Sequence, residues 1–131
     1  MSHTAIIPPG HEAASERFHF SPAIKAGDTI YCAGTIGREA DGTIPSDPER
    51  QFVLAFEAIG EVLRAAGADF SDIVEITSFH TDHPATLRIF ASVRDRYCRE
   101  PWPAWTAIGV SALGTAPGTL VEVKVIAVKK A

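Results

Sequence analysis

Residues 121–128 read Val-Glu-Val-Lys-Val-Ile-Ala-Val, an alternation that constrains the fold more than any other segment. A period of two residues sends neighbouring side chains to opposite faces of a β-strand. One face of this strand is apolar and carries Val121, Val123, Val125 and Ala127. The other face mixes apolar and charged groups and carries Leu120, Glu122, Lys124, Ile126 and Val128. We predict a strand over 119–128, with helices on its apolar face and a neighbouring subunit against the other.

Four further segments are rich in β-branched residues or alternate in polarity, as strands do. They are 18–24, 29–33, 73–80 and 105–110. The first two are separated by Lys-Ala-Gly-Asp, a short glycine-containing loop that favours a β-hairpin. Residues 1–17 show little periodicity and predict an irregular lead-in, and the turn-rich segment 35–46 predicts an exposed loop.

Two helices are predicted between these strands. Asp47 can cap the first, Pro48 suits its first position, and Gly67 favours its end. Its apolar residues recur at helical spacing: Phe52, Ala55, Phe56, Ile59, Val62, Leu63 and Ala66. The second helix is expected from about Pro84 to about Tyr97. Because both are amphipathic, we predict an α+β two-layer domain with both helices on one face of a mixed sheet.

Length and charge exclude several classes of protein. The 131 residues, 46% of them hydrophobic, fit one domain spanning 1–131 with a packed core. The net charge is −4 and the twelve Lys and Arg are scattered, which argues against nucleic-acid binding. No apolar stretch is long enough to span a membrane and no signal peptide is evident, so we expect a cytoplasmic protein. Cys32 and Cys98 are interpreted as buried thiols.

Glu122 is the first candidate for chemistry. Desolvation among apolar neighbours would disfavour its charged form, so that it could carry a proton or orient a water molecule. The alternative is an ordinary ion pair with a Lys or Arg across the sheet. The group His80-Thr81-Asp82-His83 suggests a metal site, but it runs from a strand end into a loop. A surface turn is favoured there, and no metal is expected.

Several blocks resemble the Rid (YjgF) family of reactive imine/enamine deaminases. Residues 20–27, Phe-Ser-Pro-Ala-Ile-Lys-Ala-Gly, are similar to the opening Tyr-Ser-x-Ala-Val-x-Ala-Gly of that family. Residues 30–37 resemble its strand ending in Ser-Gly-x-Ile-Gly, and 65–67 with 72–74 resemble its helix-to-strand junction. The two C-terminal strands, which include Pro103-Ala104-Trp105, complete the resemblance over nearly the whole chain.

The resemblance implies a chorismate-mutase-like fold and a homotrimer that binds small molecules in clefts between subunits. It implies no cofactor. In deaminating members an arginine of a Pro-Ala-Arg motif pairs with the substrate carboxylate, and a glutamate of the last strand positions a water. These positions are Trp105 and Glu122 here. The resemblance also places Ala33, Gly34 and Thr35 at the cleft, where backbone amides could meet a ligand oxygen.

The chain departs from the family at several ligand-binding positions. An indole lacks the charge and the bidentate fork of arginine, so binding of a small imino acid should weaken a hundredfold or more. Phe20 replaces a tyrosine and Ala107 a cysteine, while Arg94 takes the place of an asparagine on the second helix. We hypothesise that Arg94 substitutes for the missing cation; the alternative is a solvated helix arginine. Trp105 is interpreted equally as a cavity wall or as a core aromatic.

Two functions remain open from the sequence. The first is hydrolysis of an imine or enamine other than the usual small 2-imino acids, with Glu122 as the catalytic residue. The second is a non-catalytic protein that binds a small molecule in the same cleft. Endoribonuclease activity is disfavoured, because the chain is acidic and offers no paired general acid and base histidines.

Overall fold

The computed structural model of the chain describes residues 2–114 and 116–130, and its strands form one mixed sheet. In chain order the elements are β1 (Thr4–Ile6), α1 (Glu12–Phe18), β2 (Ala23–Ala26), β3 (Thr29–Cys32), α2 (Pro48–Ala65), the 3-10 helix η1 (Phe70–Asp72), β4 (Ile73–His80), α3 (Leu87–Arg94), β5 (Ala104–Gly109) and β6 (Val121–Val128). The strand order is β1-β2-β3-β6-β4-β5. Only β4 and β5 pair in parallel among the described strands.

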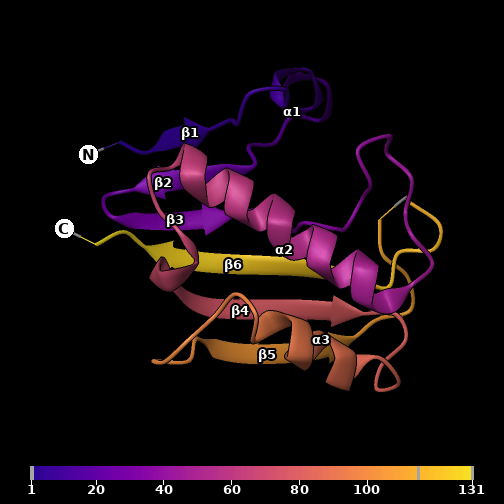
Figure 1. Cartoon of the computed structure of the whole chain (residues 1–131). Coiled ribbons are helices and arrows are strands. Elements are labelled where there is room, and N and C mark those ends of the chain that lie inside the picture. Colours follow the sequence, from indigo (N-terminus) through magenta and orange to yellow (C-terminus); the bar gives the residue numbers. More distant parts are fainter. Residues whose placement is uncertain (1, 115, 131) are drawn as a thin grey trace.

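The predicted two-layer α+β architecture is confirmed. Helices α2 and α3 lie on the same face of the sheet (Figure 1). The apolar side of β6 is buried beneath them, because Val121, Val123 and Ala127 are fully covered. None of the described helices is both long enough and apolar enough to cross a bilayer.

Helix α2 is the central element of the core, and its predicted signals are confirmed. The Asp47 side chain accepts a hydrogen bond of 2.9 Å from the Arg50 amide, and Pro48 is the first helical residue. Gly67 adopts a φ of 79°, which L-residues avoid, and so lets the chain turn away after Ala65. All the apolar residues predicted for its buried face are indeed buried.

The second predicted helix is shorter than expected. Regular helix runs over α3 only, and the residues on either side of it, from Pro84 and up to Tyr97, form turns. Phe90 and Val93 are buried as the spacing predicted. Tyr97 also packs inward, with its ring centroid 5.2 Å from that of Phe56. The periodic pattern therefore marked the buried face correctly but not the extent of the helix.

The predictions for the N-terminal region were partly wrong. Residues 1–17 were expected to be irregular, yet they include β1 and most of α1, and the strand expected over 18–24 begins only at Ala23. Helix α1 has no buried residue, so its sequence carries no apolar periodicity. Strand β1 is three residues long, too short for an alternation to be recognised. The hairpin of β2 and β3 is confirmed.

The second face of the sheet has no helix from the described chain on it. Tyr31, Ile108 and Val128 are 48%, 39% and 42% exposed there. We call this surface the open face; its members alternate along β3, β4, β5 and β6 with the residues buried under the helices. That a neighbouring subunit covers this face stays a prediction.

Candidate functional site

Glu122 lies on the open face of the central strand β6. Its neighbours Val121 and Val123 point to the helices, so its own side chain points the opposite way. The carboxylate contacts the backbone of Gly34, where a β-carbon would lie 2.8 Å from Glu122 Cδ. A β-carbon at position 34 would therefore require the Glu122 side chain to move.

The predicted alternative for Glu122, an ion pair across the sheet, is not formed. Within residues 2–114 and 116–130 no Lys, Arg or His side chain makes a salt bridge to it. Its nearest ladder partner is Phe79 on β4. Glu122 is therefore a half-buried carboxylate without a salt-bridge partner among the described residues, which leaves its oxygens available to a water molecule or a ligand.

The segment after β3 brings Gly34 to this position. Thr35 and Val123 exchange two backbone hydrogen bonds of 2.8 Å, which fasten the segment to β6. The Thr35 amide therefore already donates to the Val123 carbonyl and cannot donate to a ligand. No backbone acceptor is found for the Gly34 amide among the described hydrogen bonds. The Ala33 amide donates to the Pro22 carbonyl at 2.9 Å, so of the three amides predicted at the cleft only that of Gly34 is free to donate.

Trp105 lies on the opposite face of the sheet from Glu122. It pairs with Ile76, which is buried under the helices, whereas Glu122 pairs with Phe79 on the open face. Paired residues share a face, so the two positions project in opposite directions. Ala107, which pairs with the buried Ser78, is on the helix face with Trp105. Within one chain, the predicted catalytic residue Glu122 therefore does not lie beside Trp105, the predicted wall of the cavity.

The indole of Trp105 is held by a buried hydrogen-bond chain. Its Nε1 donates to Ser78 Oγ at 2.9 Å, and Ser78 Oγ lies 2.8 Å from His80 Nε2. Ser78 and His80 are completely buried, and His80 Nδ1 has no partner. The Ser78 hydroxyl is best satisfied when it donates to an unprotonated Nε2, since the reverse assignment leaves the hydroxyl hydrogen unpaired as well. His80 is accordingly neutral, and the only indole donor is unavailable to a ligand.

Helix α3 covers the indole from above the sheet. The Phe90 ring centroid lies 5.8 Å from that of Trp105, and the Arg94 guanidinium carbon lies 4.6 Å from the indole centroid. Arg94 also pairs with Asp95, through contacts of 2.8 and 3.1 Å to one carboxylate oxygen. Its side chain is 18% exposed. Arg94 and Trp105 are thus adjacent as a cation over a π face, and Asp95 balances the charge.

His80 predicts a pH dependence of stability. Burial, and secondarily the charge of His83, hold the pKa of His80 below its usual value of 6.5. As the pH falls below 6.5, His80 takes up a proton in the unfolded chain but not in the folded chain. The free energy of unfolding therefore decreases between pH 6.5 and the lower pKa of His80 in the folded protein. Urea unfolding at pH 7.5 and pH 5.5 should show this loss. The loss of stability between these two pH values should be smaller in His80→Gln than in the parent. His83→Gln should reduce this loss as well, but by less.

The exposed His3→Gln variant is the control for this prediction and should keep the full pH dependence. An unchanged loss of stability in His80→Gln would contradict the role given to His80. The predicted strand end at His80 and the exposed turn at Asp82 and His83 are confirmed, whereas the burial of His80 was not predicted. In the part of the chain that the structure describes, no three His, Cys, Asp or Glu side chains gather as ligands of a metal would.

Four of the predicted ligand-binding residues share one pocket. Phe20, Ala33, Gly34 and Thr35 line a cavity of about 580 Å³ beside helix α2. Gly34 thus lines this pocket and also contacts the Glu122 carboxylate, which is not itself among the lining residues. Phe20 is 46% exposed and contributes an apolar ring. Trp105, Ala107 and Arg94 are not among the residues that line it.

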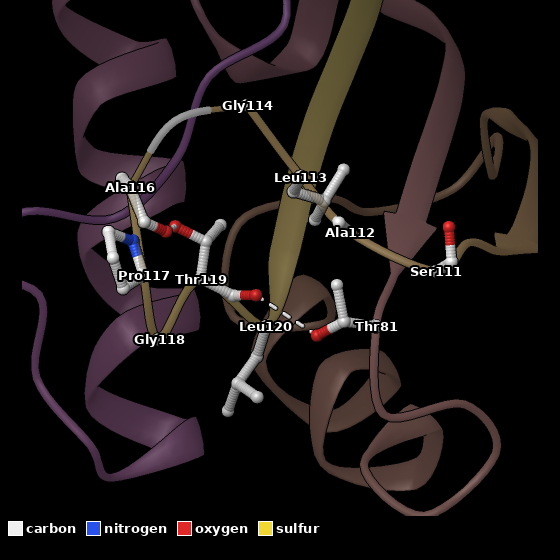
Figure 2. Close-up of a pocket in the computed structure, with 10 residues that line it drawn as sticks. All are labelled: Thr81, Ser111, Ala112, Leu113, Gly114, Ala116, Pro117, Gly118, Thr119 and Leu120. Carbon is white, nitrogen blue, oxygen red and sulfur yellow. Dashed lines mark hydrogen bonds between the residues drawn. The ribbon is translucent and has the colours of Figure 1, made fainter.

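A second pocket, of about 410 Å³, lies where β4 ends and β6 begins (Figure 2). Its lining comes mostly from the loop of residues 111–120, together with Thr81. The Thr81 hydroxyl is already committed, because it donates to the Thr119 carbonyl at 3.0 Å. None of the described lining residues is titratable, and none was predicted for the site, so this pocket offers no acid or base.

The two cysteines line neither of the two pockets described above. Cys32 and Cys98 are free and buried, as predicted. Burial raises the pKa of the Cys32 thiol to about 11, and it also raises the pKa of Cys98. Both are protonated at neutral pH and therefore poor nucleophiles.

Three residues near the site were missed by the sequence reasoning. Ser78 was assigned only to a strand, His80 only to a strand end within a group weighed as a metal site, and Arg38 only to a loop. The alternation in β4 places Ser78 and His80 on its buried face, and polar residues at buried positions indicate a hydrogen-bond partner nearby. This signal was present in the sequence. Arg38 has no comparable signal, because a loop arginine is usually solvated.

The fold defines a class: an α+β protein with two helices on one face of a mixed sheet and a glycine-flanked carboxylate on the central strand. Residues 11–129 match the family described as Endoribonuclease L-PSP. The chain belongs to this family, the Rid (YjgF) family, and the resemblance found in the sequence is confirmed.

Relatives and solved structures agree with this assignment. The RutC family protein YjgH of Escherichia coli (strain K12) is 37% identical over 128 residues, covering 97% of this chain and 95% of its own. The 2-iminobutanoate/2-iminopropanoate deaminase of Bos taurus is 34% identical over 115 residues, covering 84% and 80%. The structure of protein YJGH superposes with a TM-score of 0.84 at 36% identity over 98% of both chains. That of Rv2704 from Mycobacterium tuberculosis gives 0.82 at 28% identity over 97% and 99%.

Proposed function

We propose that the protein hydrolyses an imine or enamine metabolite larger than the usual small 2-imino acids, with Glu122 as the catalytic residue. The observation that carries this proposal is the carboxylate of Glu122, which contacts Gly34 and makes no salt bridge within residues 2–114 and 116–130. Deaminases among the relatives act on 2-iminobutanoate and 2-iminopropanoate by name, which supports the same reaction type for this chain.

The chemistry needs one base and a water molecule. Glu122 accepts a proton as the water oxygen bonds to the carbon of the protonated imine, which gives a neutral carbinolamine. The protonated carboxyl returns this proton to the nitrogen, and the regenerated carboxylate then takes the hydroxyl proton as the C–N bond breaks. A carbonyl product and ammonia leave, and the proton on the carboxyl passes to the ammonia, so Glu122 is ionised again. The free Gly34 amide is placed to donate to a ligand oxygen near the same carboxylate.

We propose that the site is completed between subunits of a homotrimer. Glu122 and Trp105 project from opposite faces of one sheet, so a second copy is needed to bring the two positions together. The open face carries exposed apolar side chains, and burying them against a neighbouring subunit would be favourable. Small molecules would then bind in the clefts between subunits.

The substrate differs from that of the deaminases because the arginine of the Pro-Ala-Arg motif is absent. Trp105 supplies no charge, and its only donor is committed to Ser78. Phe20 and Ala107 leave the surroundings apolar. A ligand with a larger apolar or aromatic body suits such a site better than a small imino acid does.

A non-catalytic binding protein is the second candidate. Phe90 and Arg94 of helix α3 cover the indole of Trp105, which occupies the position of the substrate-binding arginine. A cleft built in this way could bind a small molecule without hydrolysing it. The description of the family names an endoribonuclease, and we do not propose that activity here. Net charge is −4, and the buried His80 is unsuited to RNA cleavage.

Turnover of two imino acids tests the proposal. An amino-acid oxidase would generate 2-iminopropanoate from alanine, or the larger imino acid from phenylalanine, and semicarbazide trapping would report the imine that escapes hydrolysis. We expect kcat/KM to be about tenfold or more higher for the larger imine. A preference for the small imine would contradict the proposed substrate, and turnover of neither would favour the binding protein. Sedimentation at the assay concentration should give three times the chain mass of 14.0 kDa.

A further inference from the structure

The cavity beside α2 has an apolar body with a charged rim. We call it the Phe20 pocket. It measures about 580 Å³, enough for a ligand of the size of an aromatic acid. Its apolar lining comes from Phe20, Pro22, Ala33, Ile36, Ala58 and Val62.

Both carboxylates that line the Phe20 pocket already have partners. Arg50 donates two hydrogen bonds to Glu39, of 3.0 and 2.8 Å, and with them lowers the pKa of that carboxyl. Glu61 lies 3.2 Å from His11 Nε2. Arg50 therefore balances the charge of Glu39, whereas His11 is a polar neighbour of Glu61.

Arg38 lines the same pocket and has no such partner. Its guanidinium makes a single hydrogen bond, from Nη1 to the Gly42 carbonyl at 3.2 Å, and no salt bridge among the described residues. The turn that presents this carbonyl is itself closed by bonds between Glu39 and Thr43 and between Gly42 and Glu39, of 2.8 and 2.9 Å. Arg38 is thus anchored at one nitrogen while its remaining donors stay free.

We propose that the Phe20 pocket binds carboxylic acids with an apolar or aromatic body, and that Arg38 holds the carboxylate. A planar guanidinium with free donors is the group that recognises a carboxylate best, and the apolar wall accepts the rest of the ligand. This inference rests on the proposed function, since it names the substrate class of that site, a carboxylate-bearing imine with a large side chain.

Arg38 is better placed for this role than Arg94. Arg94 pairs with Asp95 and lies over the indole of Trp105, and it does not line the Phe20 pocket. Arg38 shares its pocket with Gly34, whose backbone contacts the Glu122 carboxylate. A carboxylate bound at Arg38 would hold the ligand in the pocket that ends at this glycine.

Equilibrium binding tests the proposal without requiring turnover. Phenylacetate and its neutral isostere phenylacetamide would be titrated by calorimetry into the intact protein and into Arg38→Gln. We expect Arg38→Gln to weaken phenylacetate about tenfold or more and to leave phenylacetamide unchanged. Arg38→Lys should recover part of the affinity, since it keeps the charge but loses the fork. Arg88→Gln is the matched control, an exposed arginine of α3 outside the pocket, and should bind like the parent.

Three results would overturn the proposal: no phenylacetate binding to the parent, equal affinity in Arg38→Gln, or a loss confined to Arg94→Gln. The last result would favour Arg94 as the substitute cation instead. Since these readouts do not depend on catalysis, they also separate the proposal from the function. If the parent protein binds phenylacetate through Arg38 but hydrolyses no imine, the proposed binding pocket is supported and the proposed enzymatic function is rejected.

Discussion

Glu122→Gln is expected to lower imine hydrolysis about a hundredfold or more, because an amide can orient water but cannot accept its proton. The substitution is nearly isosteric and keeps the contact with Gly34, so stability and oligomeric mass should be unchanged. Steady-state rates with the larger imine, together with urea unfolding of both proteins, measure the two effects separately. Affinity for phenylacetate should also be retained, which would show that the loss is in the chemical step.

The matched control is Glu75→Gln, the same substitution at an exposed position of β4. Glu75 pairs with Ile126 on the same face of the sheet as Glu122. It should leave hydrolysis within twofold of the parent, since it makes no contact with Gly34. A Glu122→Gln enzyme as active as the parent would refute the catalytic role of this residue.

Gln51→Met is expected to cost about 3 kcal/mol of unfolding free energy, because it removes three partly buried hydrogen bonds and leaves their backbone groups without a protein partner. The Gln51 amide nitrogen donates to the carbonyls of Pro45 and Gly118 at 3.0 and 3.2 Å, and its oxygen accepts from the Leu120 amide at 2.6 Å. The side chain is completely buried. Methionine has a similar volume, so the loss reports on the hydrogen bonds and not on a cavity.

Urea denaturation would measure this loss, and Ala65→Met would control for it. Ala65 is exposed at the end of the same helix, and the same residue type introduced there should change stability by less than about 0.5 kcal/mol. A Gln51→Met protein as stable as the parent would mean that water or a shifted backbone replaces the three bonds.

Most of the fold could be predicted from local patterns. The strand over 73–80 was predicted with its observed bounds, and the cap of α2 was predicted at the residue that forms it. Burial drives these patterns, so they mark elements that bury one face. Helix α1 buries none of its residues, and it was missed for that reason.

The candidate site was predictable only in part. Glu122 could be assigned to the less apolar side of its strand because alternation is a local property. The role of Trp105 remained open because the residues that contact it, Ser78 and Arg94, come from other elements. Arg38 carried no pattern, since its importance depends on which residues line the cavity beside it.

The sequence by itself determined the class of fold, the family and the face of β6 on which Glu122 lies. Each of these follows from periodicity or from ordered motifs within short segments. Only the tertiary structure decided that Gly34 contacts Glu122 and that Trp105 faces the other way. The physical reason is that both facts depend on the register between strands from distant parts of the chain, and no local pattern encodes that pairing.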